Sequence, residues 1–327
     1  MSSAGVAIVI PVLDEAGNVG ELLADCRRQE PPPAEVIVVD AGSRDGTREI
    51  VRELAATWPA LRLLERPGAL PGAGRNAGVE AATAPLIATV DAGSRVGRGW
   101  LAALSAPPRR DPRAVGVGVA VADARSSFER AAGWFTLRAF KPPDAPGPVG
   151  RSFLPAGRNG LCFTREAWAA AGGYPPALAW GEDKRFLQAL RAAGSELHVA
   201  PDAVVRWRPR ATPAELFAQY ERYGRGDAIA RIDRQNELVP LALQLAGAAL
   251  LRRALRGDRR AGTALALGTG GYLGLFAFAA ARELDDPRAV AWVPAIRVLV
   301  DVAKVKGFLA GTLRLDVSSR RAAQRSP

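Results

Sequence analysis

The stretch Leu86-Ile-Ala-Thr-Val-Asp91-Ala-Gly-Ser-Arg-Val-Gly-Arg-Gly-Trp100 joins a short apolar run to a turn rich in glycine. The run from Leu86 to Val90 is too short for a helix and lies between Pro85 and Gly93, so it predicts a buried β-strand. Ligands of open parallel sheets bind just beyond the carboxyl ends of the strands. Asp91, the first residue after this strand, is therefore a candidate ligand-binding residue.

Strand-like and helical patterns alternate in the chain before this stretch. An α/β fold with a doubly wound, mostly parallel sheet is the expected result of such alternation. The predicted strands cover 6–12, 35–39, 61–65 and 86–90, and the predicted helices between them cover 18–28, 47–57 and 75–82.

The composition limits the class of protein. The chain has 327 residues, 48% of them hydrophobic, and a formal net charge of +11, which suits phosphorylated substrates or an anionic membrane surface. An aromatic fraction of 6% argues against nucleic acid as a partner. Cys26 and Cys162 have no metal-like spacing, and no basic segment of a secretory signal precedes Val6, so we expect the catalytic part to face the cytoplasm.

Polar side chains follow the predicted strands where each of them ends. Carboxylates there suit the base and ribose of a nucleotide, and an arginine suits a phosphate. The residues at these strand ends are Asp14, Glu15, Asp40, Asp45, Arg75 and Asp91. Taken singly, Asp40, Ser43 and Asp45 are also typical turn and helix-cap residues, and that reading stays open.

These motifs together resemble family 2 of the inverting nucleotide-sugar glycosyltransferases, which have the A-type fold. The resemblance covers roughly residues 6–231 and rests on four motifs in order. They are Pro11-Val-Leu-Asp-Glu15, Val38-Val-Asp-Ala-Gly-Ser-Arg-Asp-Gly-Thr47, Arg75-Asn-Ala-Gly78 and the turn at Asp91. The resemblance implies that Pro11, Glu15, Asp40, Ser43 and Arg75 contact the donor, and that Asn159 lies near its sugar.

A metal site is implied by the same resemblance, with a departure from the family pattern. Asp91 matches the first residue of the family's Asp-x-Asp element, but Gly93 replaces the second aspartate, and Arg206 stands where related enzymes carry a histidine. A divalent metal (Mg or Mn) is expected, bound by Asp91 and mainly by the donor diphosphate itself.

The catalytic base implied by the resemblance is Asp183, in Trp180-Gly-Glu-Asp-Lys-Arg-Phe186. Trp180 and Glu182 would line the acceptor site, and Arg222 and Arg225 would bind the diphosphate. Acids at the first turn of a helix are also favourable for structural reasons alone. Likewise, the two arginines could belong to a solvated helix face.

The C-terminal part changes to long apolar segments. The run 238–251 is too short to span a bilayer, 261–281 is long enough, and 290–313 contains four charges and suits an interfacial amphipathic helix. Five arginines (Arg252, Arg253, Arg256, Arg259 and Arg260) separate the first two runs. A soluble helical bundle is the alternative to membrane association.

We therefore predict a catalytic domain at 1–232, an apolar membrane-associated helical region at 233–313 and a polar, disordered tail at 314–327. The predicted activity is inverting transfer of a sugar from a nucleoside diphosphate to a hydroxyl acceptor that is lipid-linked or part of an envelope polysaccharide. It would take place at the cytoplasmic face of the cell membrane. The alternatives are a non-catalytic nucleotide-sugar-binding scaffold and a nucleotidyltransferase.

Overall fold

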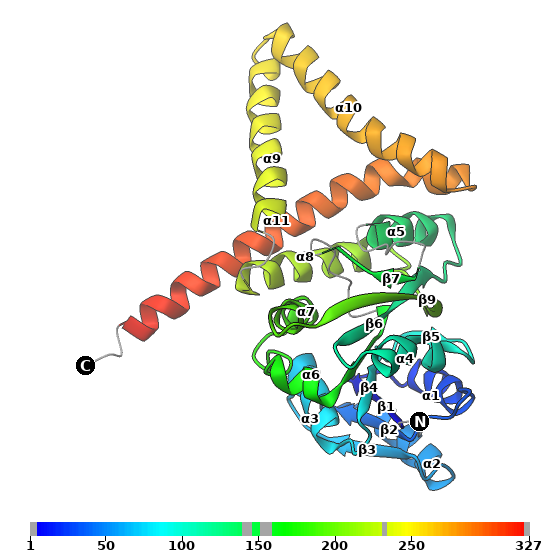
Figure 1. The fold of residues 1–327 in the computed structure, drawn as a ribbon. Coiled ribbons are helices and arrows are strands. Elements are labelled where there is room, and N and C mark those ends of the chain that lie inside the picture. Colours follow the sequence, from blue (N-terminus) through cyan, green and yellow to red (C-terminus); the bar gives the residue numbers. More distant parts are fainter. Residues whose placement is uncertain (1–4, 139–145, 151–158, 231–233, 324–327) are drawn as a thin grey trace. The chain divides into compact units, whose positions relative to one another are not determined.

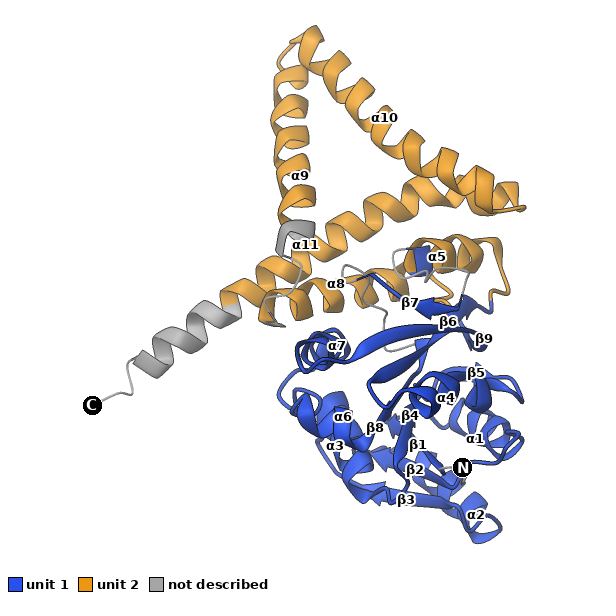
Figure 2. Cartoon of the chain, in the orientation of Figure 1, with its two compact units in different colours: residues 1–123, 137–208 blue, residues 124–136, 209–327 orange. Residues whose placement is uncertain are grey.

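The computed structural model describes all residues except 1–4, 139–145, 151–158, 231–233 and 324–327 (Figure 1). The chain forms two compact units, which Figure 2 distinguishes by colour. Unit 1 comprises residues 1–123 and 137–208, and unit 2 comprises residues 124–136 and 209–327. The second unit thus takes in the segment that follows the first, together with a short piece from the middle of the chain.

The first half of unit 1 is the predicted parallel sheet. The strands β1 (Val6–Val12), β2 (Glu35–Asp40), β3 (Leu61–Glu65) and β4 (Leu86–Thr89) pair in parallel in the order β3-β2-β1-β4. The helices between them are α1 (Val19–Arg27), α2 (Thr47–Ala56) and α3 (Pro71–Ala81). The α/β class and these elements are confirmed, although α3 begins a turn earlier than predicted because Pro71 suits the first turn of a helix.

The second half of the sheet mixes strand directions. Beyond β4 the order continues β8-β6-β9-β5, with β7 also paired to β9. The β4–β8, β6–β8, β5–β9 and β7–β9 pairs are antiparallel, and β6–β9 is parallel. The elements are β5 (Ser94–Val96), α4 (Trp100–Arg110), β6 (Ala114–Ala122), β7 (Gly147–Pro148), β8 (Leu161–Thr164), α6 (Arg165–Ala170), α7 (Glu182–Ala192) and β9 (Glu196–Trp207).

The sheet of unit 1 is buried on both faces, as a doubly wound sheet requires. Along β1, Ile8 and Ile10 belong to one apolar cluster, with α1, α2 and α4, whereas Ala7 and Val9 belong to another, with α3 and α7. Each strand therefore alternates between two cores. The carboxyl ends of β1, β2 and β4 are left at one edge for polar residues.

Unit 2 is helical. It contains most of α5 (Ser127–Arg138), with α8 (Pro213–Ala230), α9 (Arg234–Leu255), α10 (Arg259–Glu283) and α11 (Pro287–Ala323). Because α8 packs with α11, the compact units differ from the predicted domain boundary at 232. Of the predicted disordered tail, 314–323 continues the backbone of α11 and 324–327 lies outside the described residues.

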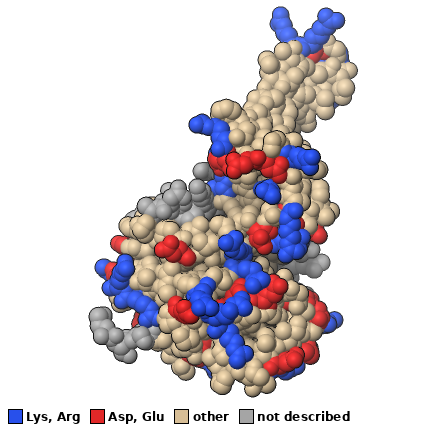
Figure 3. All heavy atoms as spheres, turned by 90° about the vertical axis from the view of Figure 1, so that its right-hand side faces the viewer, with Lys and Arg blue, Asp and Glu red and all other residues tan. Residues whose placement is uncertain are grey.

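Two helices of unit 2 are long and apolar enough to cross a membrane, by length and composition: Leu238–Leu255 and Arg259–Glu283. The apolar run 238–251 was predicted to be too short to span a bilayer, and the end given for it was wrong. The helix continues through Arg252 and Arg253 to Leu255, which makes it long enough. Figure 3 shows α9 and α10 as an arm whose visible surface lacks charge between the arginines at its end and its base.

Two glycines of α3 provide a matched test of its packing on the sheet. A Cβ at Gly78 would lie 2.4 Å from Val9 Cγ1, whereas a Cβ at Gly74 would make only ordinary contacts, from 3.7 Å outward. We expect Gly78→Ala to lower the free energy of unfolding by about 1–3 kcal/mol through overpacking. Gly74→Ala should leave it unchanged or raise it by up to about 1 kcal/mol. Urea unfolding of both variants measures the difference, and equal effects would contradict the close approach at Gly78.

Candidate active site

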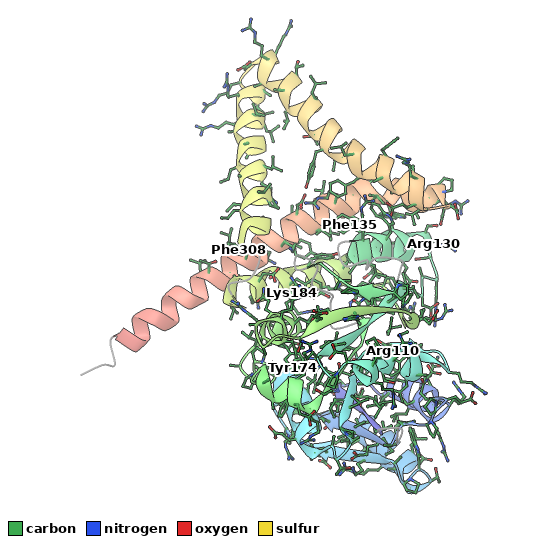
Figure 4. All side chains as sticks on the ribbon, in the orientation of Figure 1. Arg110, Arg130, Phe135, Tyr174, Lys184 and Phe308 are labelled. Atoms are coloured by element: carbon green, nitrogen blue, oxygen red, sulfur yellow. The ribbon has the colours of Figure 1, made fainter. Side chains whose placement is uncertain are left out.

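Arg75 of α3 is a buried cation held between two carboxylates. Its Nη2 donates to Asp91 Oδ1 at 2.8 Å, and its Nη1 donates to Glu182 Oε1 at 2.7 Å. Glu182 is buried like Arg75, whereas the Asp91 side chain is 42% exposed. The ring of Tyr174, labelled in Figure 4, lies 5.5 Å from the guanidinium carbon. These contacts join α3, the end of β4 and the start of α7.

The protonation of this cluster depends on its own charges. Burial opposes the charge of Arg75, but the carboxylates of Asp91 and Glu182 more than offset this, so the pKa of Arg75 is raised. Burial raises the pKa of Glu182, while Arg75 acts in the opposite direction. The ionised form of Glu182 is therefore stabilised mainly by its contact with Arg75.

The predicted base, Asp183, follows Glu182 directly in the first turn of α7. Gly181, with φ of 77°, precedes the helix and turns the chain into it. The Asp183 Oδ1 accepts the backbone N–H of Lys184 at 2.8 Å, and the charge of Asp183 contributes to the raised pKa of Arg75. Trp180 is half-buried two residues before the helix. The structure thus brings Asp183, Glu182, Arg75 and Asp91 to one place.

The predicted nucleotide-contacting residues lie at the ends of β1 and β2, which are neighbours in the sheet. Asp40 is buried and accepts the N–H groups of Gly42 and Ser43, at 3.0 and 3.1 Å. The Ser43 Oγ in turn accepts the N–H of Asp14 at 2.9 Å. These bonds fit the turn reading of Asp40 and Ser43, and they also fix the loop that follows β1 against the loop that follows β2.

Glu15 and Pro11 complete this edge. Glu15 Oε2 accepts a hydrogen bond from Asn18 Nδ2 at 2.7 Å, and the Asn18 side chain makes no capping bond to α1. Pro11 is in register with Val39 of β2. The structure therefore groups Pro11 and Glu15 with Asp40 and Ser43 at the carboxyl ends of adjacent parallel strands.

Asn159 has an unused polar atom in a buried position. Its Nδ2 donates to the carbonyl of Gly118 at 3.0 Å, whereas its Oδ1 has no hydrogen-bond partner among the described residues. A buried acceptor without a partner costs free energy, so it is expected to have a ligand or water as partner. That Asn159 lies near a bound sugar stays a prediction.

Arg222 and Arg225 lie on α8 in unit 2, and their contact with a diphosphate stays a prediction. Arg225 Nη2 approaches Glu221 Oε1 on the same helix at 3.3 Å. Its Nε is buried without a hydrogen-bond partner among the described residues.

Asn76 is a positioning residue that the sequence analysis did not select. Its Nδ2 donates to the carbonyl of Tyr174, and its Oδ1 accepts the Tyr174 N–H, both at 2.8 Å. This amide therefore holds the turn that places the Tyr174 ring beside Arg75. The available signal was its position directly after Arg75 in the motif Arg75-Asn-Ala-Gly78.

The chain's own residues do not form a complete metal site. In the part of the chain that the structure describes, no group of three or more histidine, cysteine, aspartate or glutamate residues is arranged to hold a metal ion. Asp91 already accepts a bond from Arg75, and Gly93 offers no ligand. Any metal here would therefore need the oxygens of a bound ligand.

The ion pairs of Arg75 lead to a stability prediction. Arg75→Met leaves Glu182 buried without a counterion and should lower the free energy of unfolding by about 3 kcal/mol at pH 8. The pKa of Glu182 would rise further above its ordinary 4.5, so the loss should be small near pH 4 and grow as the pH rises and Glu182 ionises. Urea unfolding at both pH values measures this.

The double variant Arg75→Met/Glu182→Gln is the control, because it removes the isolated carboxylate as well. It should recover much of the loss at pH 8. A loss in Arg75→Met that is independent of pH would mean that the two ion pairs do not control the charge of Glu182.

Known proteins resemble this chain in sequence. The model for glycosyl transferase family 2 matches residues 7–154. The succinoglycan biosynthesis protein ExoA of Rhizobium meliloti (strain 1021) is 30% identical over 238 residues, which are 70% of this chain and 70% of that protein. The glycosyltransferase AglE of Haloferax volcanii is 36% identical over 101 residues, or 29% of this chain and 33% of AglE.

A solved structure shares the fold. The mannosyltransferase PcManGT from Pyrobaculum calidifontis, determined in complex with GDP-Man and Mn²⁺, superposes with a TM-score of 0.61 at 23% identity. The match covers 92% of this chain and 86% of that one. The predicted A-type glycosyltransferase fold is thereby confirmed, and the match to ExoA establishes the family: this chain belongs to glycosyltransferase family 2.

Proposed function

We propose that this glycosyltransferase is inverting and moves a sugar from a nucleoside diphosphate to a hydroxyl group of a lipid-linked or polysaccharide acceptor. The observation that carries the proposal is the cluster of Asp91, Arg75 and Glu182, with Asp183 beside it. The cluster lies at the carboxyl end of β4, and ligands of such sheets bind at that edge, which supports a role for Arg75 and Asp183 in the reaction.

In the proposed reaction, Asp183 accepts the proton of the acceptor hydroxyl while that oxygen bonds to the anomeric carbon. The bond from this carbon to the diphosphate oxygen breaks in the same step, so the configuration inverts. A positioned base contributes about 10²–10⁴-fold to such reactions. Trp180 and Glu182 would line the acceptor side, with Glu182 held in place by Arg75.

The donor site in this proposal consists of Pro11, Glu15, Asp40 and Ser43 for the nucleoside and Asn159 for the sugar. Arg222 and Arg225 would bind the diphosphate as it leaves. Arg75 already donates to two carboxylates, so a phosphate contact with Arg75 would have to share one of these bonds. GDP-mannose, the donor in the PcManGT complex, is a suitable first compound to test, beside the uridine and thymidine diphosphate sugars.

We place the activity at the cytoplasmic face of a membrane. The support is the apolar composition of α9 and α10 and the exposure of their large side chains, including Leu243, Leu267 and Phe278. Similarity to the succinoglycan biosynthesis protein ExoA favours an acceptor on a growing envelope polysaccharide.

Asp183→Asn tests the proposed base. We expect the rate of sugar transfer to fall by about 10²–10⁴-fold, because the amide cannot take the proton, while donor affinity changes little. Transfer to lipid extracts and donor affinity by calorimetry are the measurements, and the anomeric configuration of the product by NMR tests inversion. The matched control is Glu166→Gln, an exposed acid in the first turn of α6, which should leave transfer unchanged.

Other outcomes would lead to different conclusions. Retained transfer in Asp183→Asn would remove Asp183 as the base. Donor binding without turnover by the wild-type chain would favour a nucleotide-sugar-binding scaffold. The reason to consider that alternative is Gly93, which replaces the second aspartate of the family's Asp-x-Asp element.

A divalent metal (Mg²⁺ or Mn²⁺) would be held by Asp91 and the donor's phosphate oxygens and would offset charge on the leaving diphosphate. We expect Mn²⁺ alone to bind weakly, and its affinity to rise at least tenfold when a nucleoside diphosphate is present. Titration of free Mn²⁺ by electron paramagnetic resonance measures both. Asp91→Asn should abolish the increase, and tight binding of Mn²⁺ without nucleotide would show that the chain has further ligands.

A further inference from the structure

The arm formed by α9 and α10, residues 238–271, is exposed and apolar. Its large exposed side chains include Leu245 at 64%, Leu255 at 80% and Leu267 at 72%. Five arginines and one aspartate lie at its end, between residues 252 and 260. Apolar surface ending in concentrated positive charge suits a membrane leaflet with anionic lipids.

The two ends of this arm return to the same place, because α8 and α11 are packed backbone to backbone. A Cβ at Gly224 of α8 would lie 2.2 Å from the Lys304 carbonyl, and one at Gly307 of α11 would lie 2.0 Å from the Glu221 carbonyl. Lys306 Nζ also bonds Glu221 Oε2 at 3.1 Å. Since α8 precedes the arm and α11 follows it, the arm crosses a membrane either twice or not at all.

The second half of α10 is not free to cross. Tyr272 donates its hydroxyl hydrogen to Asp301 of α11 at 2.8 Å, and Asp301 pairs with Arg297. The Arg297 guanidinium carbon lies 5.2 Å from the ring centroid of Tyr272 and 4.7 Å from that of Phe276. It also lies 5.5 Å from the ring centroid of Phe135 of α5, a residue labelled in Figure 4.

The part of α10 before Tyr272 is therefore its only free length. Residues 259–271 extend about 20 Å at 1.5 Å per residue, against a hydrocarbon core of about 30 Å. A full crossing would draw the Arg297–Asp301 pair and the charged helices α5 and α8 into the bilayer. A partial crossing, end first, would leave five arginines in hydrocarbon, which is costly.

The exposed side of α11 fits a different arrangement. Val298, Val302, Leu309 and Leu313 are 44–67% exposed and lie on one helix face by their spacing. The opposite face, with Val293, Ile296 and Val300, packs in the core of unit 2. An apolar stripe along the length of a helix contacts a membrane when the helix lies parallel to its surface.

We propose that unit 2 binds one leaflet of an anionic membrane without crossing it. The arm and the α11 stripe lie in the interface, and the arginines at residues 252–260 contact lipid phosphates. This inference rests on the membrane association proposed above and specifies its form.

Accessibility of a single thiol at the end of the arm tests the proposal. Arg256→Cys places a thiol in the turn between α9 and α10, and Glu53→Cys places one on the exposed side of α2 in unit 1. The native Cys26 and Cys162 are buried, and burial raises the pKa of both thiols, that of Cys162 to about 12, so the wild-type chain should not react. The full-length chain is made in bacterial cells and labelled with a membrane-impermeant maleimide.

We expect both engineered thiols to react in inside-out vesicles and neither to react in intact spheroplasts. Reaction of Arg256→Cys in spheroplasts, with Glu53→Cys protected there, would mean that α9 and α10 cross the membrane and would overturn the proposal. Protection of Arg256→Cys on both sides would overturn it too, because the turn would then be buried in hydrocarbon. A chain absent from the membrane fraction would overturn the membrane association itself, while the transfer assay remained a separate test of the activity.

The lipid partner is tested by flotation with vesicles of phosphatidylcholine alone or with phosphatidylglycerol. An arginine near an anionic surface contributes about fivefold to binding, so Arg256→Gln/Arg260→Gln should lower partition onto phosphatidylglycerol vesicles by about 25-fold at low salt. The control with the same change in net charge is Arg98→Gln/Arg113→Gln, on exposed arginines of unit 1, which should bind as the wild type does. Equal loss in both double variants would show that the arm has no special role in lipid contact.

Discussion

A buried guanidinium between two carboxylates determines how the segments around the candidate active site of unit 1 are positioned. Arg75 loses its hydration on folding, and the contacts with Asp91 and Glu182 contribute most to offsetting that cost. Asp91 belongs to the end of β4 and Glu182 to the start of α7, so the ion pairs fix two separate segments relative to α3. Because Asp183 follows Glu182 in the first turn of α7, the same pairs restrict where its carboxylate can lie.

The glycines around Arg75 allow this arrangement. A Cβ at Gly72 would lie 2.5 Å from the Pro175 carbonyl, and a Cβ at Gly78 would collide with Val9. Both positions therefore let α3 approach its neighbours more closely than any other residue would permit. The glycines of segment 71–78 thus serve the close packing of α3, whose first turns this segment forms.

The first half of the fold could be read from the sequence, because its strands are short apolar runs closed by turn residues and its helices have one apolar side. Asp91 was identifiable from its place after such a strand. The pairing of Arg75 with Glu182 was not, since these residues are 107 positions apart and nothing in a single sequence joins them. The mixed direction of β8, β6 and β9 was equally inaccessible, because an apolar run does not encode whether its neighbour is parallel.

In unit 2 the sequence was ambiguous for a physical reason. The segment 290–313 is apolar on two opposite sides of one helix, with charges between them, so composition alone could not separate a packed helix from an interfacial one. The structure assigns one side to the core with α8 and leaves the other, with Val302 and Leu309, exposed. Because α11 is packed against α8, it could enter a bilayer only together with that helix. Charged residues such as Asp227 of α8 and Lys304 of α11, whose Oδ2 and Nζ lie 3.8 Å apart, would then enter the hydrocarbon too, which is costly. The packing of α11 on α8 therefore limits the ways in which the whole chain can meet a membrane.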